Sequence, residues 1–179
     1  MTTLPAYDAS NPAAYITSRL ALVEGQDAVA LLKEAPSRIA RALEGVTESD
    51  ARRPEASGAW SVLQVVRHLA DSEIVYGYRL RLITGADRPE IVGYDQGHWA
   101  DALEYHRGTV EDALEEYASA RRGTVRFLRA LPDDAWDRVG LHSERGEESI
   151  RRIVALLAAH DIGHEQQIER IRAALEDRS

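Results

Sequence analysis

The C-terminal segment of the chain carries polar side chains inside an apolar helical face. At about 100° per residue, positions three and four apart fall on one side of a helix. From residue 150 onward, that side contains Ile150, Ile153, Leu156, Leu157, His160, His164, Gln167, Ile168, Ile171 and Leu175. Two histidines and a glutamine therefore point into the expected core. Because an unpaired buried polar group costs about 1–3 kcal/mol, these side chains need partners inside the fold.

The spacing of His160 and His164 lets both imidazoles reach one point, since residues four apart on a helix have Cβ atoms about 5–6 Å apart. This pair alone is consistent with a shared metal ion and with a hydrogen-bonded cluster in the core. A third histidine, His68, lies in another helical segment, which begins at Ser61 and Gln64 in a capping-box arrangement. His68 lies at the edge of the apolar face of that segment. The sequence therefore predicts a metal site on His68, His160 and His164.

The chain contains no cysteine. This excludes disulfides, thiolate metal ligands and cysteine nucleophiles within it, so any thiol chemistry needs a thiol from outside. Structural zinc sites are usually closed by four ligands rich in cysteine, whereas three histidines with a free fourth position are typical of catalytic sites. The sequence predicts one divalent ion per chain with an open position, where the ion activates a water or another oxygen or sulfur ligand.

Four further polar residues are candidates for orienting a metal ligand or a bound water. Asp71 lies one turn beyond His68, and Asp161 directly follows the first histidine of the pair. Glu73 falls inside the apolar arc of its helix, which indicates a place near the metal or at a helix interface. Gln167 shares the face of the histidine pair. For Asp71, a solvated position on the helix surface is an equally good interpretation.

Helical periodicity accounts for most of the chain, and no stretch alternates with period two over a useful length. Four long helices are expected, at about residues 27–43, 61–84, 109–130 and from 149 onward. Pro36 is expected to kink or divide the first of them. With 179 residues, 44% of them hydrophobic, the chain is long enough for one domain, 1–179, whose residues 1–25 form an N-terminal lead-in. The predicted fold class is all-α, a four-helix bundle with short extra helices.

The longest connection lies between the second and third expected helices. It contains Tyr94 and Trp99, which are candidates for a substrate-binding wall, although aromatic residues in such connections also close the end of a bundle. His98, His106 and His142 fall in loops or at helix edges and are expected to be solvated. His142 would approach the open side of the site only if its loop folds back.

Charge and hydropathy restrict the partners and the location. The formal net charge is −8, and basic residues form only short runs, such as Arg52 with Arg53 and Arg121 with Arg122. Nucleic-acid binding needs a concentrated basic face, so we expect no nucleic-acid partner. No stretch approaches 18 uninterrupted apolar residues, and the first basic residue is Arg19, which argues against a membrane span and a signal peptide. We therefore expect a soluble, cytoplasmic protein.

Four motifs in the chain resemble, in order and spacing, the DinB/YfiT-like superfamily. They are residues 60–73 (WSVLQVVRHLADSE), 93–96 (GYDQ) with Trp99, 131–136 (LPDDAW) and 160–168 (HDIGHEQQI). The likeness covers about residues 26–176. It implies a four-helix bundle with a long crossover connection, a divalent ion such as zinc or nickel, and a homodimer. Carried over to this chain, the metal ligands are His68, His160 and His164.

The resemblance leaves several activities open, because this superfamily includes thiol S-transferases, thiol-dependent isomerases and proteins described as metal-dependent hydrolases. The lack of cysteine fits a transferase, in which a small-molecule thiol becomes a thiolate and is presented to an electrophile substrate. In the hydrolase alternative, an activated water replaces the thiolate, and Asp71, Glu73 or Asp161 acts as the base. A third interpretation is a non-catalytic stress or interaction module whose ion mainly holds two helices together.

Overall fold

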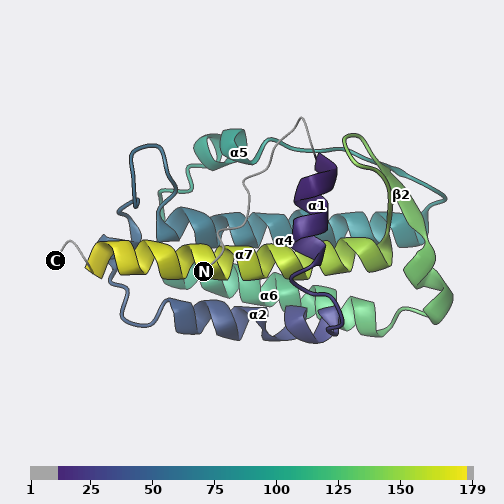
Figure 1. Ribbon diagram of the computed structural model, residues 1–179, viewed down its shortest axis with the longest axis horizontal. Helices are drawn as coiled ribbons and strands as arrows, with labels where there is room; N and C mark the ends of the chain where they lie inside the picture. The colour runs from purple at the N-terminus through teal and green to yellow at the C-terminus, as the bar shows by residue number, and fades with distance from the viewer. Residues whose placement is uncertain (1–11, 177–179) are drawn as a thin grey trace.

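The computed structural model describes residues 12–176, and its body is a bundle of four long helices (Figure 1). They are α2 (Ala28–Ala42), α4 (Val62–Gly85), α6 (Val110–Arg129) and α7 (Ile150–Glu176). Three shorter helices accompany them, α1 (Pro12–Leu20), α3 (Glu48–Ala51) and α5 (Gln96–Ala102). The predicted four-helix bundle is confirmed, and each predicted end of a long helix lies within one residue of the observed one. Residues 1–11 of the predicted lead-in lie outside the described residues.

Side chains that accept hydrogen bonds from the first free N–H groups fix the starts of the helices. The Asp27 carboxylate accepts from the backbone N–H groups of Val29 and Ala30, at 2.9 and 3.1 Å. Ser61 and Gln64 form both halves of the predicted capping box, with N···O distances of 3.4 and 3.0 Å. The capping box sets the first residue of α4. It thereby fixes which side of α4 faces the bundle.

The order of the helices around the bundle differs from their order in the chain. α4 packs against α6 and α7, and α2 packs against the same two helices from the other side. The segment between α4 and α6, which contains α5, runs back along the bundle, so α4 and α6 end at the same end of the molecule (Figure 1). This is the long crossover connection that the family resemblance implies. α7 starts at that shared end and therefore runs antiparallel to α4.

A small three-stranded sheet lies at the end of the bundle where α4 and α6 end. The sequence patterns did not predict it. β1 (Glu90–Ile91) pairs in parallel with β2 (Val139–His142), which pairs antiparallel with β3 (Gly146–Ser149). Strands of two to four residues are too short for a period-two pattern to be recognised. The sheet makes His142 the register partner of Ile91 and leaves it only 3% exposed. The expectation that His142 is solvated is therefore wrong, whereas His98 and His106 are exposed.

Pro36 does not divide α2, which is helical from Ala28 to Ala42. A proline inside a helix lacks the N–H that would bond the carbonyl four residues earlier, here that of Leu32. Nη1 of Arg121 donates to this carbonyl oxygen at 3.2 Å and satisfies it. A side chain from α6 thus replaces the missing backbone hydrogen bond. Of the two expected effects of Pro36, a kink or a division, the division is wrong, because the carbonyl left free by the proline finds its partner elsewhere in the chain.

The same arginine lies at the centre of a buried charge network that joins all four long helices. Besides the Leu32 carbonyl of α2, Arg121 binds the carboxylates of Glu73 on α4 and Asp161 on α7. Arg121, Glu73 and Asp161 are each 1% exposed. Glu73 therefore lies in the apolar arc of α4 because its partner is inside the bundle. A buried charge is tolerated where it is paired and hydrogen-bonded in this way.

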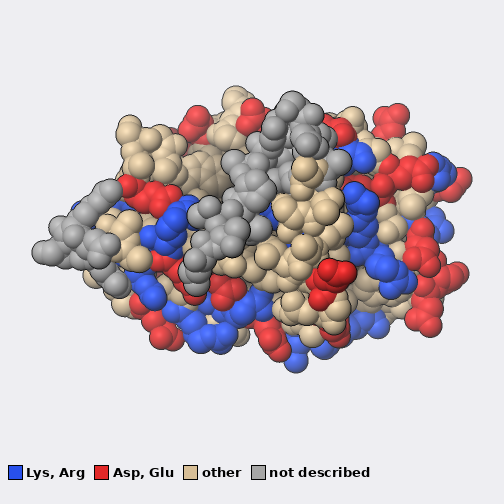
Figure 2. Space-filling model, viewed as in Figure 1, with Lys and Arg blue, Asp and Glu red and all other residues tan. Residues whose placement is uncertain are grey.

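The surface of the bundle carries charges of both signs. On the face shown in Figure 2, blue basic and red acidic side chains are interspersed over the helices. Within residues 12–176, no helix combines the length and the apolar character that crossing a membrane requires.

Candidate metal centre

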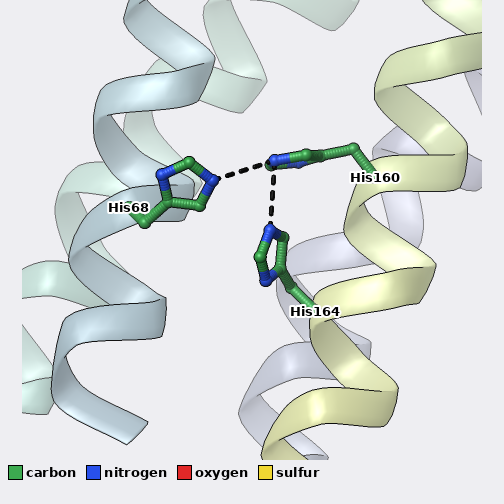
Figure 3. Close-up of side chains that lie close together, drawn as sticks. All are labelled: His68, His160 and His164. Atoms are coloured by element: carbon green, nitrogen blue, oxygen red, sulfur yellow. Dashed lines mark hydrogen bonds between the residues drawn. The ribbon is translucent and has the colours of Figure 1, made fainter. Parts of the chain in front are cut away.

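Three histidines from two helices bring their ring nitrogens together (Figure 3). His68 lies on α4, while His160 and His164 lie one turn apart on α7. The Nε2 atom of His160 lies 3.0 Å from Nε2 of His68 and 3.1 Å from Nε2 of His164. One possible ligand atom from each ring lies within 4.8 Å of the others. The antiparallel packing of α4 against α7 therefore creates a cluster of three donor nitrogens.

Hydrogen bonds among the three rings alone cannot pair all three Nε2 atoms. Each imidazole nitrogen carries either one proton or one lone pair in the ring plane, so Nε2 of His160 can pair with only one of its two neighbours. In a tetrahedral site with metal–nitrogen distances of about 2.0–2.1 Å, ligand nitrogens lie roughly 3.3 Å apart. Two of the three separations, 3.0 and 3.1 Å, approach that value, and all three lie within 4.8 Å. The donor set fits a divalent ion with room for a further ligand.

The rings of His68 and His164 are held in the neutral form. Burial lowers the pKa of His68 well below its usual range, and repulsion from His164 and His160 lowers it further. Burial is also the main reason that the pKa of His164 falls to about 3. Nδ1 of His164 donates to Oε1 of Gln167 at 2.8 Å, so the proton lies on Nδ1 and the Nε2 lone pair faces the cluster. A neutral imidazole with an available lone pair is the form that coordinates a metal.

The Nδ1 atoms of the other two rings are held less firmly than Nδ1 of His164. Nδ1 of His68 and Nδ1 of His160 are buried, and neither has a hydrogen-bond partner in the described part of the chain. Oδ1 of Asp161 lies 3.9 Å from Nδ1 of His160, too far for a hydrogen bond but close enough for electrostatic attraction. The ring of Trp60 packs against His68 with centroids 5.0 Å apart. Packing and charge, more than hydrogen bonding, orient these two rings.

Two hydroxyl groups lie next to the cluster. Oγ of Ser72, one turn beyond His68 on α4, is 3.3 Å from Nε2 of His68 and 3.1 Å from the hydroxyl of Tyr94. Tyr94 comes from the crossover connection, and the ring of Trp99 packs against it with centroids 4.5 Å apart. Tyr94 therefore reaches the cluster through Ser72, while Trp99 supports the Tyr94 ring.

The three carboxylates considered as a catalytic base all have partners of their own. Oδ2 of Asp71 accepts a hydrogen bond from the hydroxyl of Tyr105 at 2.5 Å. Glu73 and Asp161 bind the guanidinium of Arg121 inside the bundle. Although burial acts to raise the pKa of Asp161, Arg121 lowers it to about 2. Asp161 is therefore ionised at pH 7 beside the cluster.

A cavity of ≈ 510 Å³ opens onto His160. Its wall comes from α1, α4, the crossover connection, the β2–β3 hairpin and α7. The lining residues are Ile16, Arg19, Tyr76, Arg79, Gly93, Tyr94, Asp95, Gln96, His142, Glu144, Arg145, Leu156 and His160. A volume of this size is typical of sites that bind small molecules.

Arg79 is a cavity residue, and it belongs to a line of polar side chains that the sequence pattern of α4 already indicates. His68, Ser72 and Arg79 are four and seven residues apart, so they share one line along α4. Arg79 is 4% exposed and lines the cavity rather than reaching bulk water. Gly163 has a function that only the structure reveals, because a Cβ there would lie 2.5 Å from Nη1 of Arg19. The glycine makes room for an arginine beside the histidine pair.

Comparison with known proteins agrees with this geometry. A solved structure described as "YfiT from Bacillus subtilis is a probable metal-dependent hydrolase with an unusual four-helix bundle topology" superposes with a TM-score of 0.78. It is 25% identical in sequence, and the match covers 83% of this chain and 86% of that one. This chain therefore shares its helical-bundle fold with that protein.

Relatives found by sequence have the same description. "Putative metal-dependent hydrolase OB0782" from Oceanobacillus iheyensis is 32% identical over 108 residues, which cover 60% of this chain and 62% of the relative. "Putative metal-dependent hydrolase YfiT" from Bacillus subtilis is 27% identical over 146 residues, which cover 79% of this chain and 82% of the relative. A family model described as the DinB superfamily matches residues 31–168, a range that includes all three histidines. The chain belongs to the DinB superfamily.

Proposed function

We propose that this protein is a metal-dependent transferase that joins a low-molecular-weight thiol to a small electrophile. The observation that carries the proposal is the cluster of His68, His160 and His164 at the edge of a cavity large enough for a small molecule. The neutral rings of His68 and His164 support metal binding. The chain has no cysteine, so the thiol must come from a second substrate.

Different residues around the cluster have different roles in this proposal. The three histidines hold one divalent ion, zinc or nickel, which when bound supplies a Lewis acid that favours the deprotonated form of a coordinated thiol or water. The hydroxyl of Tyr94, which lines the cavity and lies 3.1 Å from Oγ of Ser72, donates a hydrogen bond to the reacting molecule. Tyr76 and Leu156 give the cavity apolar walls, which position the substrate and exclude water.

A hydrolase is the second candidate, and the names of the relatives favour it. Hydrolysis needs a base to take a proton from water. Asp71, Glu73 and Asp161 are each engaged by another side chain, which makes them poor candidates for that base. Glu144, an exposed residue of the cavity lining, is the better candidate for a hydrolase. The transferase is preferred because a free thiol, with a pKa of about 8.5, releases its proton to solvent far more readily than water, with a pKa of about 15.7, and so depends less on a neighbouring base.

Metal analysis and two assays test the proposal together. Elemental analysis is done on the wild type, His68→Ala, His164→Ala and the control His106→Ala, which removes an exposed histidine. We expect about one divalent ion per chain in the wild type and the control, and loss of the ion in the other two. Each protein is then assayed with a chromogenic aryl halide and a panel of small thiols, and with p-nitrophenyl esters without thiol.

The outcomes separate the candidate functions. Thiol-dependent turnover that is lost with the ion supports the transferase, whereas ester hydrolysis without thiol replaces it with the hydrolase. A bound ion without turnover in either assay, together with a large loss of stability on chelation, indicates a non-catalytic module. A wild-type protein without a stoichiometric ion contradicts all three.

A further inference from the structure

We propose that the cavity beside the histidine cluster binds the anionic group of a small organic acid, with Arg79 as the main anchor. The inference rests on the proposed function only in taking this acid to be a reacting molecule. The anion-binding site itself depends on residues other than the three histidines.

Arg79 is a buried cation without a carboxylate partner in the described part of the chain. It is 4% exposed, and its Nη2 donates to the backbone oxygen of Val92 at 2.8 Å. The guanidinium also lies over the rings of Tyr76 and Tyr94, with Cζ 5.5 and 5.9 Å from their centroids. Burial lowers the pKa of Arg79, the effect expected for a charge removed from water. A guanidinium has five N–H groups, so most of its donors remain for a ligand.

His142 lines the same cavity and carries a second unpaired donor. It is 3% exposed, and its Nδ1 accepts a hydrogen bond from the backbone N–H of Glu144 at 3.1 Å. Burial and then the charge of Arg145 lower the pKa of His142 to about 4, so the ring is neutral at pH 7. In a neutral ring whose Nδ1 accepts, the proton lies on Nε2. That atom is buried and has no hydrogen-bond partner within residues 12–176.

The carboxylates around the cavity leave Arg79 without an ion-pair partner in the described part of the chain. Arg145 forms a bidentate ion pair with buried Glu148, and both N···O distances are 2.8 Å. Asp95 caps α5 by accepting from the backbone N–H of His98 at 2.9 Å. Asp95 and Glu144 are exposed, so the negative charges lie at the rim.

The arrangement specifies the class of ligand. A guanidinium fork matches the planar geometry of a carboxylate and also binds the oxygens of a phosphate. Tyr76, Tyr94, Ile16 and Leu156 supply apolar surface next to the arginine. The ligand is therefore a small acid with an apolar body, and His160 lines the same cavity. An acid anchored at Arg79 would direct its body towards the histidine cluster.

Binding of a charged probe and its neutral analogue tests the inference. Benzoate, benzamide and phenyl phosphate are titrated by calorimetry into the metal-free and the metal-loaded protein. The metal-free protein is essential because benzoate also coordinates metals. We expect benzoate to bind at least tenfold more tightly than benzamide in both forms. Phenyl phosphate distinguishes the two anion chemistries, since the better of the two anions identifies the group that the site prefers.

Arginine variants identify the anchor. Arg79→Gln should weaken benzoate binding at least tenfold and leave benzamide binding unchanged, whereas Arg79→Lys should give an intermediate loss because it keeps the charge but not the fork. Arg107→Gln, at an exposed arginine outside the cavity, is the matched control. If Arg79→Gln does not fold, the affinities for benzoate and benzamide are compared in the wild type and in Arg79→Lys, and this comparison shows whether Arg79 anchors the anion. Equal binding of the two probes, or binding of benzoate unaffected by the loss of Arg79, overturns the proposal.

The two proposals can fail separately. Selective benzoate binding without thiol-dependent turnover leaves the anion site intact and overturns the transferase. Thiol transfer to a neutral electrophile, without selectivity for benzoate over benzamide, leaves the transferase intact and overturns the anion site.

Discussion

Arg121 and Asp161 form an ion pair that is closed off from solvent, with each side chain 1% exposed. Asp161 directly follows His160, and its Oδ1 lies 3.9 Å from Nδ1 of that ring. The pair therefore connects the charge network that joins the four helices to the cluster of histidines. Because Glu73 also binds Arg121, two carboxylates share one guanidinium. The two carboxylates are not equivalent, and this difference leads to a prediction.

Asp161→Asn should destabilise the protein far more than Glu73→Gln. Arg121 lowers the pKa of Asp161 to about 2 against the effect of burial, so the ionised form is strongly favoured in the fold. For Glu73 burial prevails, and the pKa is raised. Removing one partner of a buried ion pair costs about 3–5 kcal/mol, which we expect for Asp161→Asn, with less than half that loss for Glu73→Gln. Urea unfolding of the metal-free proteins, followed by circular dichroism, measures both.

Glu169→Gln, which changes an exposed carboxylate on α7, is the control for loss of charge alone. Equal losses for Asp161→Asn and Glu73→Gln would show that the two carboxylates contribute equally to binding Arg121.

Because of the ion pair between Glu55 and Arg170, the free energy of unfolding should depend on pH in the acid range. Nε and Nη2 of Arg170, on α7, donate to the two oxygens of Glu55 at 3.0 and 2.9 Å and lower its pKa. A lowered folded pKa stabilises the fold above the unfolded value of about 4.3, and this contribution disappears as the pH falls through the folded pKa. Glu55→Gln should therefore be less stable than the wild type at pH 7, and this difference should shrink as the pH falls below about 4.3. The Arg170 side chain is 51% exposed, so the difference should stay below about 1 kcal/mol.

Thermal unfolding from pH 3 to pH 7 provides the measurement, with Glu111→Gln at an exposed helix position as the control. A difference between Glu55→Gln and the wild type that stays constant over this range would contradict a contribution from ionised Glu55.

Gly163→Ala should change the cavity without weakening the helix. A Cβ at this position would lie 2.5 Å from Nη1 of Arg19, the flexible end of a long side chain, which can move away. Alanine inside a helix is favoured over glycine by about 1 kcal/mol, so the free energy of unfolding should stay the same or rise. Because Arg19 lines the cavity, the affinity for an anionic ligand should fall while the metal content is retained. Gly123→Ala, where a Cβ would meet nothing within 4 Å, is the control.

Urea unfolding, elemental analysis and benzoate titration measure the three effects. A loss of stability for Gly163→Ala would mean that the arginine is fixed in place and that the glycine is a packing requirement.

Tyr94→Phe should lower activity while leaving fold and metal content unchanged. The substitution keeps the ring that packs against Trp99 and removes the hydroxyl that lies 3.1 Å from Oγ of Ser72. If the hydroxyl donates to the reacting molecule, its loss should reduce kcat about tenfold or more, with a smaller change in KM. Tyr78→Phe, at an exposed tyrosine on α4, is the matched control. An unchanged kcat would mean that Tyr94 has only a structural role beside Ser72.

The helices could be predicted from the sequence because their signals are local. Apolar residues recur every three or four positions, and capping residues such as Ser61 and Asp27 mark the starts. The same periodicity puts His160 and His164 on the inner face of α7 and His68 on that of α4. Their convergence follows once the two helices are known to pack together. This explains why residues 92 apart in sequence, His68 and His160, could be assigned to one cluster.

The residues that could not be predicted depend on contacts between distant segments. Arg121 is one of two adjacent arginines in the sequence, and nothing local shows that one is buried among partners from three other helices. His142 is buried by a strand pairing with Ile91, and the strands are too short for a hydropathy pattern. The cavity likewise combines α1, the crossover connection and the hairpin. Hydrophobic periodicity describes the elements, whereas these sites depend on how the connections fold over them.

Removal of the metal should destabilise the wild type but not a variant that lacks a ligand. A ligand that binds only the folded state stabilises it by about 2.7 kcal/mol when its concentration is a hundred times Kd. Excess chelator should therefore lower the Tm of the wild type and of the control His98→Ala, an exposed histidine. His160→Ala removes the ring whose Nε2 lies within 3.1 Å of both other Nε2 atoms, so its Tm should not respond to chelator. Differential scanning calorimetry measures these shifts. Equal responses of wild type and His160→Ala would mean that the stabilising ion binds elsewhere, whereas a response confined to proteins with all three rings would assign it to this cluster.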